Sequence, residues 1–160
     1  MSKCKNCGTE TKNKKFCSKN CQYEYKFKHS KRKRSKLEKY LYSRIQKDFY
    51  GLEVKSNDRT VLNENLELDI YLPKIRVAFE IQGLMHYKFV KYFHHTYDNF
   101  IKQRIRDNRK RILCFHNGII LIYIQNFSTF NVKTAEKIYF EQVRPVILAV
   151  LSGNMRYVTF

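Results

Sequence analysis

Two runs of alternating apolar residues, at 66–72 and 75–81, constrain the fold of this chain more than any other part of its sequence. Alternation with a period of two is typical of a strand that turns one face to a core. Pro73 and Lys74 separate the runs, and proline suits the first position of a turn, so we expect an antiparallel hairpin with a two-residue turn. The apolar positions are Leu66, Leu68, Ile70, Leu72, Ile75, Val77, Phe79 and Ile81.

The opposite face of this hairpin carries acids. If Leu72 pairs with Ile75, Asp69 lies across from Ala78 and diagonal to Glu80, at roughly 7–8 Å between backbones. Carboxylate oxygens at such a separation are ligands that Mg²⁺ prefers, together with water and substrate phosphate. We therefore expect a magnesium site at Asp69 and Glu80, with Gln82 beside it. The alternative is a polar face that simply meets water.

The net charge of the chain indicates its partner. Thirty-two Lys and Arg residues against fourteen Asp and Glu residues give a formal charge of +18. A charge of this size attracts polyanions, so nucleic acid is the expected partner. A membrane partner is not expected, because no apolar run approaches the ~18 residues that span a bilayer and the first residues carry no secretory signal pattern. A cytoplasmic location follows as an expectation.

Four cysteines near the N-terminus have the spacing of a zinc site. Cys4 and Cys7 form one close pair, Cys17 and Cys21 form another, and a lysine-rich spacer separates the pairs. Two such pairs suit a tetrahedral Zn²⁺ ion. Two disulfides are the alternative, which a reducing compartment disfavours. We expect residues 1–26 to form a zinc knuckle that needs its metal to fold, because so polar a segment has no core.

A basic run at 27–36 follows this module and leads into a predicted helix. We expect the run to be a linker that binds phosphates. The candidate phosphate-binding residues are Lys31, Arg32, Lys33 and Arg34. In the helix that follows, up to about residue 49, Glu38 falls inside the apolar stripe. A buried carboxylate needs a cation or a donor, so Glu38 is a candidate site residue. Ser35 and Glu38 also match a capping box, which is the alternative role.

A histidine and a second predicted helix follow the hairpin. Gly83 permits a bend at the end of the strand, so His86 is expected to lie over the acids, where it could exchange a proton with substrate. Residues 97–116 are predicted to form a helix that contains Asp107 among five basic residues. Its expected core face consists of Phe100, Ile101, Ile105, Ile112 and Phe115. Several of the basic residues should contact the DNA backbone, and the candidates are Arg104, Arg109, Lys110 and Arg111.

The order of these motifs resembles a known nuclease family. ELDIYLP and FEIQGLMHY, then RDNRKRILC, then NGIILIYI, resemble the EDxHD group of homing endonucleases from phages and group-I introns. This group is related to the very-short-patch repair endonuclease and belongs to the PD-(D/E)xK superfamily. The likeness covers roughly residues 35–126. The segment FCSKNCQYEY likewise resembles zinc knuckles at the N-termini of phage-type endonucleases.

The resemblance implies a fold, a reaction and a set of catalytic residues. The fold would be α/β (α+β), with a small mixed sheet flanked by helices in a restriction-endonuclease-like core at 37–160. The reaction would be Mg²⁺-dependent hydrolysis of phosphodiester bonds in double-stranded DNA. The motif positions fall on Glu38, Asp69, His86 and Asp107, with Glu80 as a further ligand or supporting group. Gln82 stands where the wider superfamily usually has a lysine, which favours His86 as the acid–base group.

Two other functions and an oligomer stay open at this level. The chain could be a repair or mismatch nicking endonuclease with the same chemistry, or a DNA-binding protein on a nuclease fold that no longer cleaves. A helix interrupted at Pro145 is predicted near the C-terminus. Its apolar residues could cover the sheet or form a homodimer interface, and a dimer would let one small site per chain cut both DNA strands.

Overall fold

The chain divides into two compact units, Met1–Arg34 and Ser35–Phe160. The structure, a computed structural model, describes residues 1–29 and 34–155. The division lies two residues before the start expected for the main domain. Three of the expected phosphate-binding residues, Lys31, Arg32 and Lys33, lie outside the described residues.

The first unit is a short hairpin followed by a helix. Strands β1 (Ser2–Lys3) and β2 (Glu10–Thr11) pair antiparallel, and α1 spans Lys19–His29. Gly8, with φ +75°, closes the hairpin by donating its N–H to the carbonyl of Cys4 at 2.9 Å. The helix passes the boundary expected at residue 26. Among the described residues of this unit, Cys4 is the one buried apolar side chain, so the unit has no hydrophobic core.

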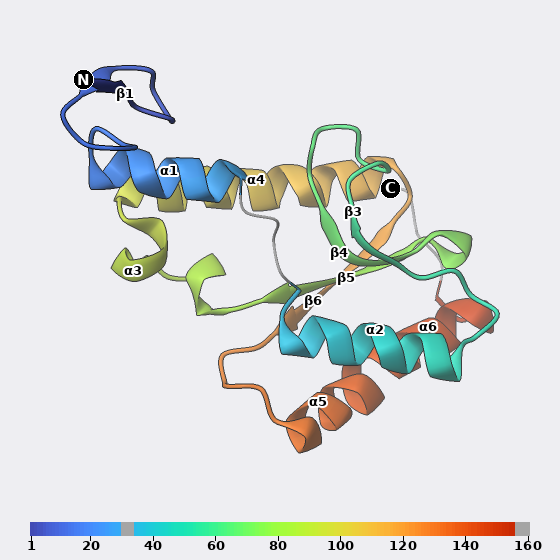
Figure 1. Ribbon diagram of the computed structural model, residues 1–160. Coiled ribbons are helices and arrows are strands. Elements are labelled where there is room, and N and C mark those ends of the chain that lie inside the picture. The colour runs from blue at the N-terminus through green and yellow to red at the C-terminus, as the bar shows by residue number, and fades with distance from the viewer. Residues whose placement is uncertain (30–33, 156–160) are drawn as a thin grey trace. The chain divides into compact units, whose positions relative to one another are not determined.

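The second unit is built on a four-stranded mixed sheet with the order β3-β4-β5-β6 (Figure 1). Its strands are β3 (Lys55–Asp58), β4 (Leu68–Leu72), β5 (Val77–Gln82) and β6 (Ile120–Gln125). The first two pairings are antiparallel, and β5 pairs with β6 in parallel. A parallel pair needs a long crossover, which the helix between β5 and β6 supplies. The expected small mixed sheet flanked by helices is confirmed.

The hairpin turn between β4 and β5 is longer than its sequence suggests. Pro73–Ile75 form a 3₁₀ turn, and Arg76 follows it in the left-handed region with φ +52°. Leu72 therefore pairs with Val77 instead of Ile75. The shift is two residues, so Ile70, Leu72, Val77 and Phe79 share one face as predicted. Leu68, expected on that face too, packs instead in the smaller core with Tyr71 and Ala78. The shift nevertheless corrects the register, because Asp69 now faces Glu80 directly and not Ala78.

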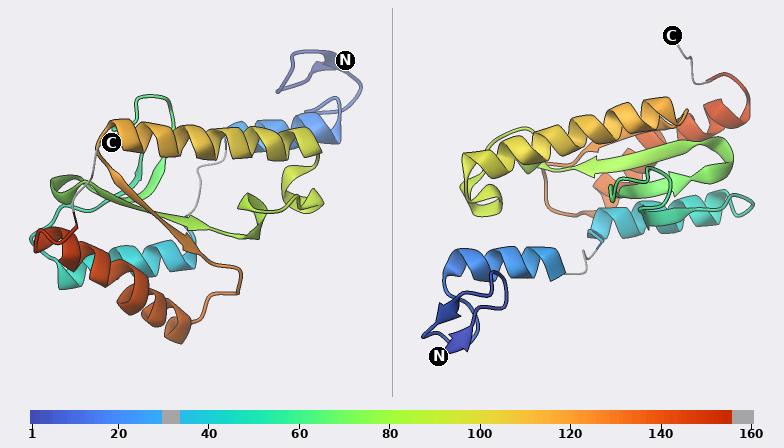
Figure 2. Two further views of the ribbon diagram at one scale, coloured as in Figure 1. Left: turned by 180° about the vertical axis from the view of Figure 1, so that it is seen from behind. Right: turned by 90° about the horizontal axis from the view of Figure 1, so that it is seen from above.

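Helices cover both faces of the sheet (Figures 1 and 2). On one face lie α2 (Lys36–Asp48), α5 (Val132–Ile138) and α6 (Arg144–Leu151). They bury the main core, whose largest members include Leu41, Ile45, Phe79 and Tyr139. On the other face lies α4 (Tyr97–His116). Its C-terminal part closes a smaller core with Ala78 and Cys114.

The C-terminal helix bends where the sequence predicts an interruption. Residues Tyr139–Val143 form a π-helical turn between α5 and α6, and the N–H of Arg144 reaches the carbonyl of Tyr139. Pro145 has no N–H to give, and a wider turn before it avoids the clash with the preceding carbonyls.

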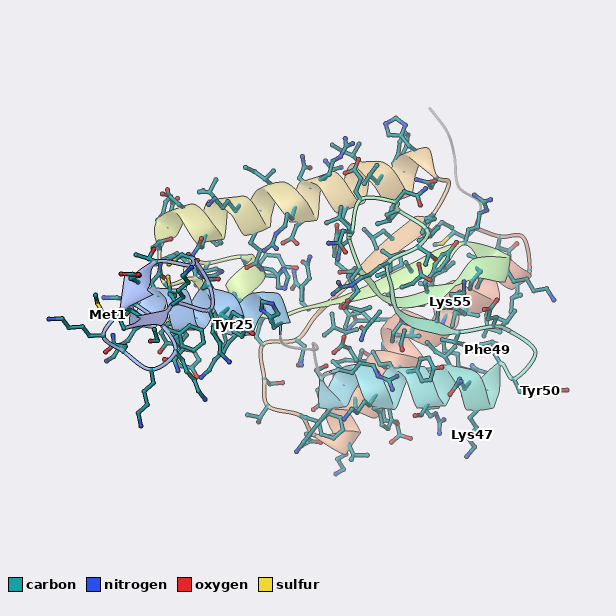
Figure 3. All side chains as sticks on the ribbon, turned by 45° about the horizontal axis from the view of Figure 1, so that its top comes forward. Met1, Tyr25, Lys47, Phe49, Tyr50 and Lys55 are labelled. Carbon is teal, nitrogen blue, oxygen red and sulfur yellow. The ribbon has the colours of Figure 1, made fainter. Side chains whose placement is uncertain are left out.

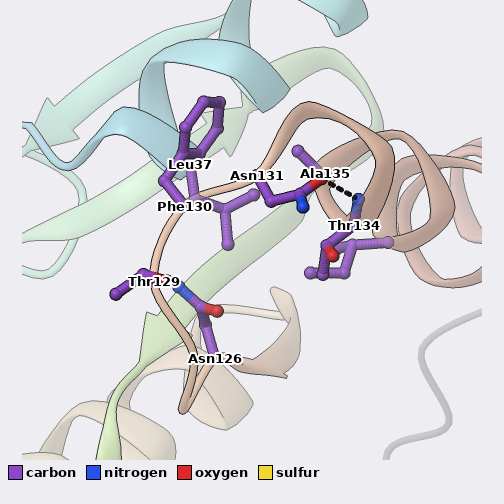
Figure 4. Close-up of a pocket in the computed structure, with 8 residues that line it drawn as sticks. Leu37, Asn126, Thr129, Phe130, Asn131, Thr134 and Ala135 are labelled. Carbon is purple, nitrogen blue, oxygen red and sulfur yellow. Dashed lines mark hydrogen bonds between the residues drawn. The ribbon is translucent and has the colours of Figure 1, made fainter.

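Asn131 caps the start of α5 by accepting the N–H of Thr134, beside a cavity of only about 10 Å³ (Figure 4).

The inward face of α4 carries polar side chains between Phe100 and Cys114, where the sequence predicted apolar ones. Its apolar residues Ile101, Ile105 and Phe115 are 40%, 63% and 41% exposed, although their spacing suggested a core face. The residues turned inward repeat at intervals of three and four, which places them on one side of a helix. They are Phe100, Gln103, Asp107, Lys110 and Cys114.

Several aromatic side chains lie at the surface instead of the core. Tyr50, in the loop after α2, is 93% exposed, and Figure 3 shows it and Lys47 extending away from the molecule. Tyr92, in the short helix α3 (Lys91–His94), is 80% exposed.

Within the described residues, no helix has the length and apolar character needed to span a bilayer.

The packing of α2 leads to a test of the core. Leu41 is fully buried against the sheet, so Leu41→Ala should lower the free energy of unfolding by about 2–5 kcal/mol, through lost burial and the cavity left behind. Lys39→Ala, at an exposed position of the same helix, should change it by less than about 0.5 kcal/mol. Urea denaturation of the two variants measures the difference, and equal effects would contradict this packing.

Candidate functional site

The ladder between β4 and β5 opens where the two acids face each other. The paired residues nearest this opening are Ile70 and Phe79. Beyond this pair, the Asp69 N–H donates to Oε1 of Glu80 at 3.1 Å, and the Ile81 N–H donates to Oδ2 of Asp69 at 2.9 Å. Each carboxylate thus accepts a backbone N–H of the opposite strand. This arrangement holds both acids at one point of the sheet.

Both acids are buried. Asp69 is 1% exposed and Glu80 is 4% exposed, because α4 lies over this face of the sheet. A polar face open to water, the alternative considered from the sequence, does not describe them. Buried charges are costly unless they are paired or bind a metal, so this pair requires cations nearby.

Lys110 supplies one such cation. Its Nζ donates to Oε2 of Glu80 at 2.6 Å, and its side chain is 12% exposed. Lys110, a residue expected at the DNA backbone, thus lies on the face of α4 that meets the sheet and is paired with Glu80. The signal that could have revealed it is the spacing of Asp107, Lys110 and Cys114, at intervals of three and four.

The environment of Glu80 raises the pKa of its carboxyl group to about 7. Burial is the largest cause, and the nearby charge of Asp69 acts in the same direction. The ammonium group of Lys110 lowers the pKa but does not outweigh these two effects. The two acids and one lysine therefore leave a surplus of negative charge when both acids are ionised.

His86 and Asp107 form the second part of the site. His86 ends the 3₁₀ turn η2 (Leu84–His86), and its Nδ1 lies 2.9 Å from Oδ2 of Asp107 on α4. Arg104 donates to the carbonyl of His86 at 3.2 Å and anchors the turn to the same helix. A carboxylate on Nδ1 orients an imidazole and leaves Nε2 as the nitrogen that can meet a substrate. The expected contact between His86 and Asp107 is thus present.

Gln82 is held at the end of β5. It is 7% exposed, and its Oε1 accepts the hydroxyl hydrogen of Tyr87 at 2.7 Å. Gln82 therefore lies beside the acids on the sheet, but its neutral side chain adds no charge to the site.

Glu38 occupies the capping role that its sequence allowed. Its N–H donates to the hydroxyl of Ser35 at 3.1 Å, and its carboxylate accepts the N–H of Ser35. The residue is 2% exposed at the first turn of α2. The capping box is confirmed, and the part of Glu38 in a catalytic site stays a prediction.

The remaining basic candidates on α4 divide by their partners. Arg109 donates from Nε to Glu64 at 2.8 Å, and this ion pair lowers the pKa of Glu64. Arg111 is exposed and contacts Asn108 on its own helix. Arg104 and Arg111 therefore keep the exposed positions expected of a DNA contact, whereas Arg109 is already paired.

The four N-terminal cysteines form a cluster that could hold a metal. Their sulfur atoms all lie within 4.8 Å of one another. None of the five cysteines forms a disulfide, so the alternative pairing is not adopted. The backbone N–H of Cys7 is the largest cause that lowers the pKa of Cys4, to about 6, which favours a thiolate. Among residues 1–29 and 34–155, His, Cys, Asp and Glu side chains form no second group of three or more this close.

Comparison with known proteins finds viral relatives. The chain is 34% identical over 84 residues to uncharacterized protein 307L of Invertebrate iridescent virus 6, which covers 52% of the chain and 41% of the relative. It is 36% identical over 64 residues to uncharacterized protein 033L of Invertebrate iridescent virus 3, covering 40% and 33%. It is 42% identical over 60 residues to uncharacterized protein 094L of Frog virus 3, covering 37% and 39%.

These matches span less than half the length of each relative. No family model matches the chain, and no solved structure matches it. The resemblance to phage endonucleases implies a phage-encoded protein in the cytoplasm of a bacterial host cell. The relatives come instead from viruses named after invertebrate and frog hosts.

The pKa of Glu80 predicts a pH dependence of stability. The folded state binds this proton more tightly than an unfolded chain with a pKa near 4.5, so the free energy of unfolding should fall as pH rises from about 4.5 to 7. The fall from this group should be on the order of 3 kcal/mol or less. Glu80→Gln removes the titration, so its curve should be flatter than that of the wild type without divalent ions. Parallel curves would contradict this assignment.

Proposed function

We propose that this chain is a Mg²⁺-dependent endonuclease that hydrolyses phosphodiester bonds in double-stranded DNA. The observation that carries the proposal is the opening of the β4–β5 ladder, where Asp69 and Glu80 lie buried against each other beside Lys110. Buried acids with a surplus of negative charge suit a site for a divalent cation. A fold needs no such arrangement for stability, since apolar residues of similar size would pack at lower cost.

The donor set fits magnesium. Carboxylate oxygens are hard ligands, and Asp69 and Glu80 would hold the ion. Their present bonds to backbone amides use one oxygen of each side chain, Oδ2 of Asp69 and Oε1 of Glu80. Bound there, Mg²⁺ would polarise the scissile phosphate and lower the pKa of its water ligand. A divalent ion would also lower the raised pKa of Glu80, because it stabilises the ionised carboxyl group.

His86 is the proton-transfer group of the proposed mechanism. Asp107 holds its Nδ1, which orients Nε2 to take a proton from the attacking water or to return it to the leaving oxygen. Gln82 and the capped Glu38 complete the expected set of catalytic side chains. Lys110 provides the positive charge that Gln82 does not, and it reaches Glu80 from α4 instead of from the strand.

The charge of the chain supports DNA as the substrate. A formal charge of +18 favours a polyanion, and the exposed Arg104 and Arg111 lie on the helix that carries Asp107. Arg104 also contacts the backbone of His86, so a phosphate bound to it would lie near the proposed base. A homing role, with cleavage at few sites, is what the resemblance to EDxHD endonucleases suggests. A nicking role in repair uses the same groups.

A cleavage assay tests the proposal. Supercoiled plasmid should be nicked or linearised with Mg²⁺ and left intact with EDTA. Asp69→Asn should abolish the Mg²⁺-dependent reaction, and His86→Ala should slow it by about 10²–10⁴-fold, the usual contribution of a general acid or base. Glu136→Gln, at an exposed acid of α5, is the matched control and should cleave like the wild type.

The same assay separates the rival functions. Salt-sensitive DNA binding without cleavage under any divalent ion would contradict the enzymatic proposal and favour a DNA-binding protein on this fold. Products nicked in one strand only would favour the nickase. Sedimentation of the protein with and without DNA would show whether a homodimer forms.

For the cysteine cluster, the proposed metal is Zn²⁺. Four thiolates at Zn–S bonds of ~2.3 Å in a tetrahedron lie about 3.8 Å apart. The sulfur of Cys17 lies 3.6 Å from that of Cys7 and 3.3 Å from that of Cys21, which is close to this spacing. The first unit has no core, so the ion would supply its folding energy.

Metal analysis of the purified chain tests this site. Wild type should contain about one zinc ion per chain by mass spectrometry of the native protein. Cys17→Ser should lose it, and residues 1–29 should become sensitive to protease. Cys114→Ala, which removes the one cysteine outside the cluster, should keep its zinc. Zinc loss in both variants would place the metal elsewhere.

A further inference from the structure

His94 is a buried histidine that the proposed mechanism does not use. It ends α3, is 3% exposed, and packs against Phe100 and Phe89 at 5.0 Å and 5.7 Å between ring centroids. A buried imidazole requires hydrogen-bond partners for both ring nitrogens. Those partners lead from His94 to the proposed base.

The backbone of Val90 sets which nitrogen of His94 carries the proton. The Val90 N–H donates to Nδ1 at 2.9 Å. The Val90 carbonyl lies 3.1 Å from the same nitrogen, but it already accepts the N–H groups of Phe93 and His94 at 3.0 Å and 2.9 Å. Its two lone pairs are therefore occupied. Nδ1 acts as an acceptor, so the neutral ring carries its hydrogen on Nε2.

Gln103 connects His94 to His86, and the tautomer of His94 fixes the orientation of the Gln103 side-chain amide. Its side chain is buried on the inward face of α4, and its Oε1 lies 3.2 Å from Nε2 of His94. A donor at Nε2 keeps the amide oxygen on this side. The amide nitrogen then points at Nδ1 of His86, which lies 3.1 Å away.

Two partners consequently make opposite demands on Nδ1 of His86. The amide nitrogen of Gln103 can only donate, so it requires a lone pair there. The carboxylate of Asp107, 2.9 Å from the same atom, requires a hydrogen. In a neutral ring, a lone pair at Nδ1 places the hydrogen on Nε2, and a hydrogen at Nδ1 leaves Nε2 able to accept a proton.

We infer that His94 and Gln103 are positioning residues that set the tautomer of His86 in competition with Asp107. They favour the form with its hydrogen on Nε2, and Asp107 favours the form whose Nε2 can act as a base. The balance between them sets the fraction of His86 that is ready to take a proton. The catalytic meaning of this balance rests on the proposed function, but the tautomer itself does not.

Nitrogen-15 NMR of the imidazole rings measures the tautomer directly, in protein without DNA or Mg²⁺ and at a pH about two units above the ordinary histidine pKa of ~6.5. Gln103→Leu should raise the ratio of Nδ1–H to Nε2–H at His86 by about fivefold, the effect of one neutral hydrogen bond. Asp107→Asn should lower the ratio. Gln46→Leu, at an exposed glutamine of α2, should leave it unchanged.

His94→Phe provides a second measurement, since it keeps an aromatic ring in the same packing and lets the Gln103 amide turn over. It should raise the ratio in the same direction as Gln103→Leu. An unchanged ratio in either variant, with the other resonances in their native positions, would overturn the inference. A shifted ratio in a chain that never cleaves DNA would refute the proposed function and leave the inference standing.

Discussion

The second unit depends on how two buried carboxylates are accommodated between β4 and β5. Where the ladder opens, the carboxylates of Asp69 and Glu80 each accept a backbone N–H of the opposite strand, and Lys110 from α4 offsets part of their charge. Covering this face with α4 is what desolvates them and raises the pKa of Glu80. The same helix brings Asp107 to His86. One polar face of one helix therefore assembles both halves of the site.

This arrangement explains why α4 does not follow the usual amphipathic pattern. Exposing apolar side chains to water is unfavourable, and Ile101, Ile105 and Phe115 are nevertheless exposed on this helix. The inward face must instead supply a cation and hydrogen-bond donors to the sheet. Stability and the requirements of a site oppose each other in this helix, and the polar contacts decide which face is buried.

The first unit depends on different physics. It lacks a core among its described residues, and four sulfur atoms within 4.8 Å of one another are its central feature. A bound metal would give it the folding energy that apolar burial gives the second unit. A single basic chain thus joins a module whose four cysteines could hold a metal to a second unit built on an apolar core.

Local patterns in the sequence determined much of this protein. The alternation at 66–82 predicted the hairpin and the shared face of Ile70, Leu72, Val77 and Phe79. The capping box at Ser35 and Glu38 and the spacing of the cysteines were also legible, because each depends on neighbouring residues. The tertiary structure alone decided the pairing of Asp69 with Glu80, the inward turn of Lys110 and the contacts of His94 with Gln103. The turn at Pro73–Arg76 sets the strand register, and packing selects which face of α4 is buried. Neither is a property of a short segment.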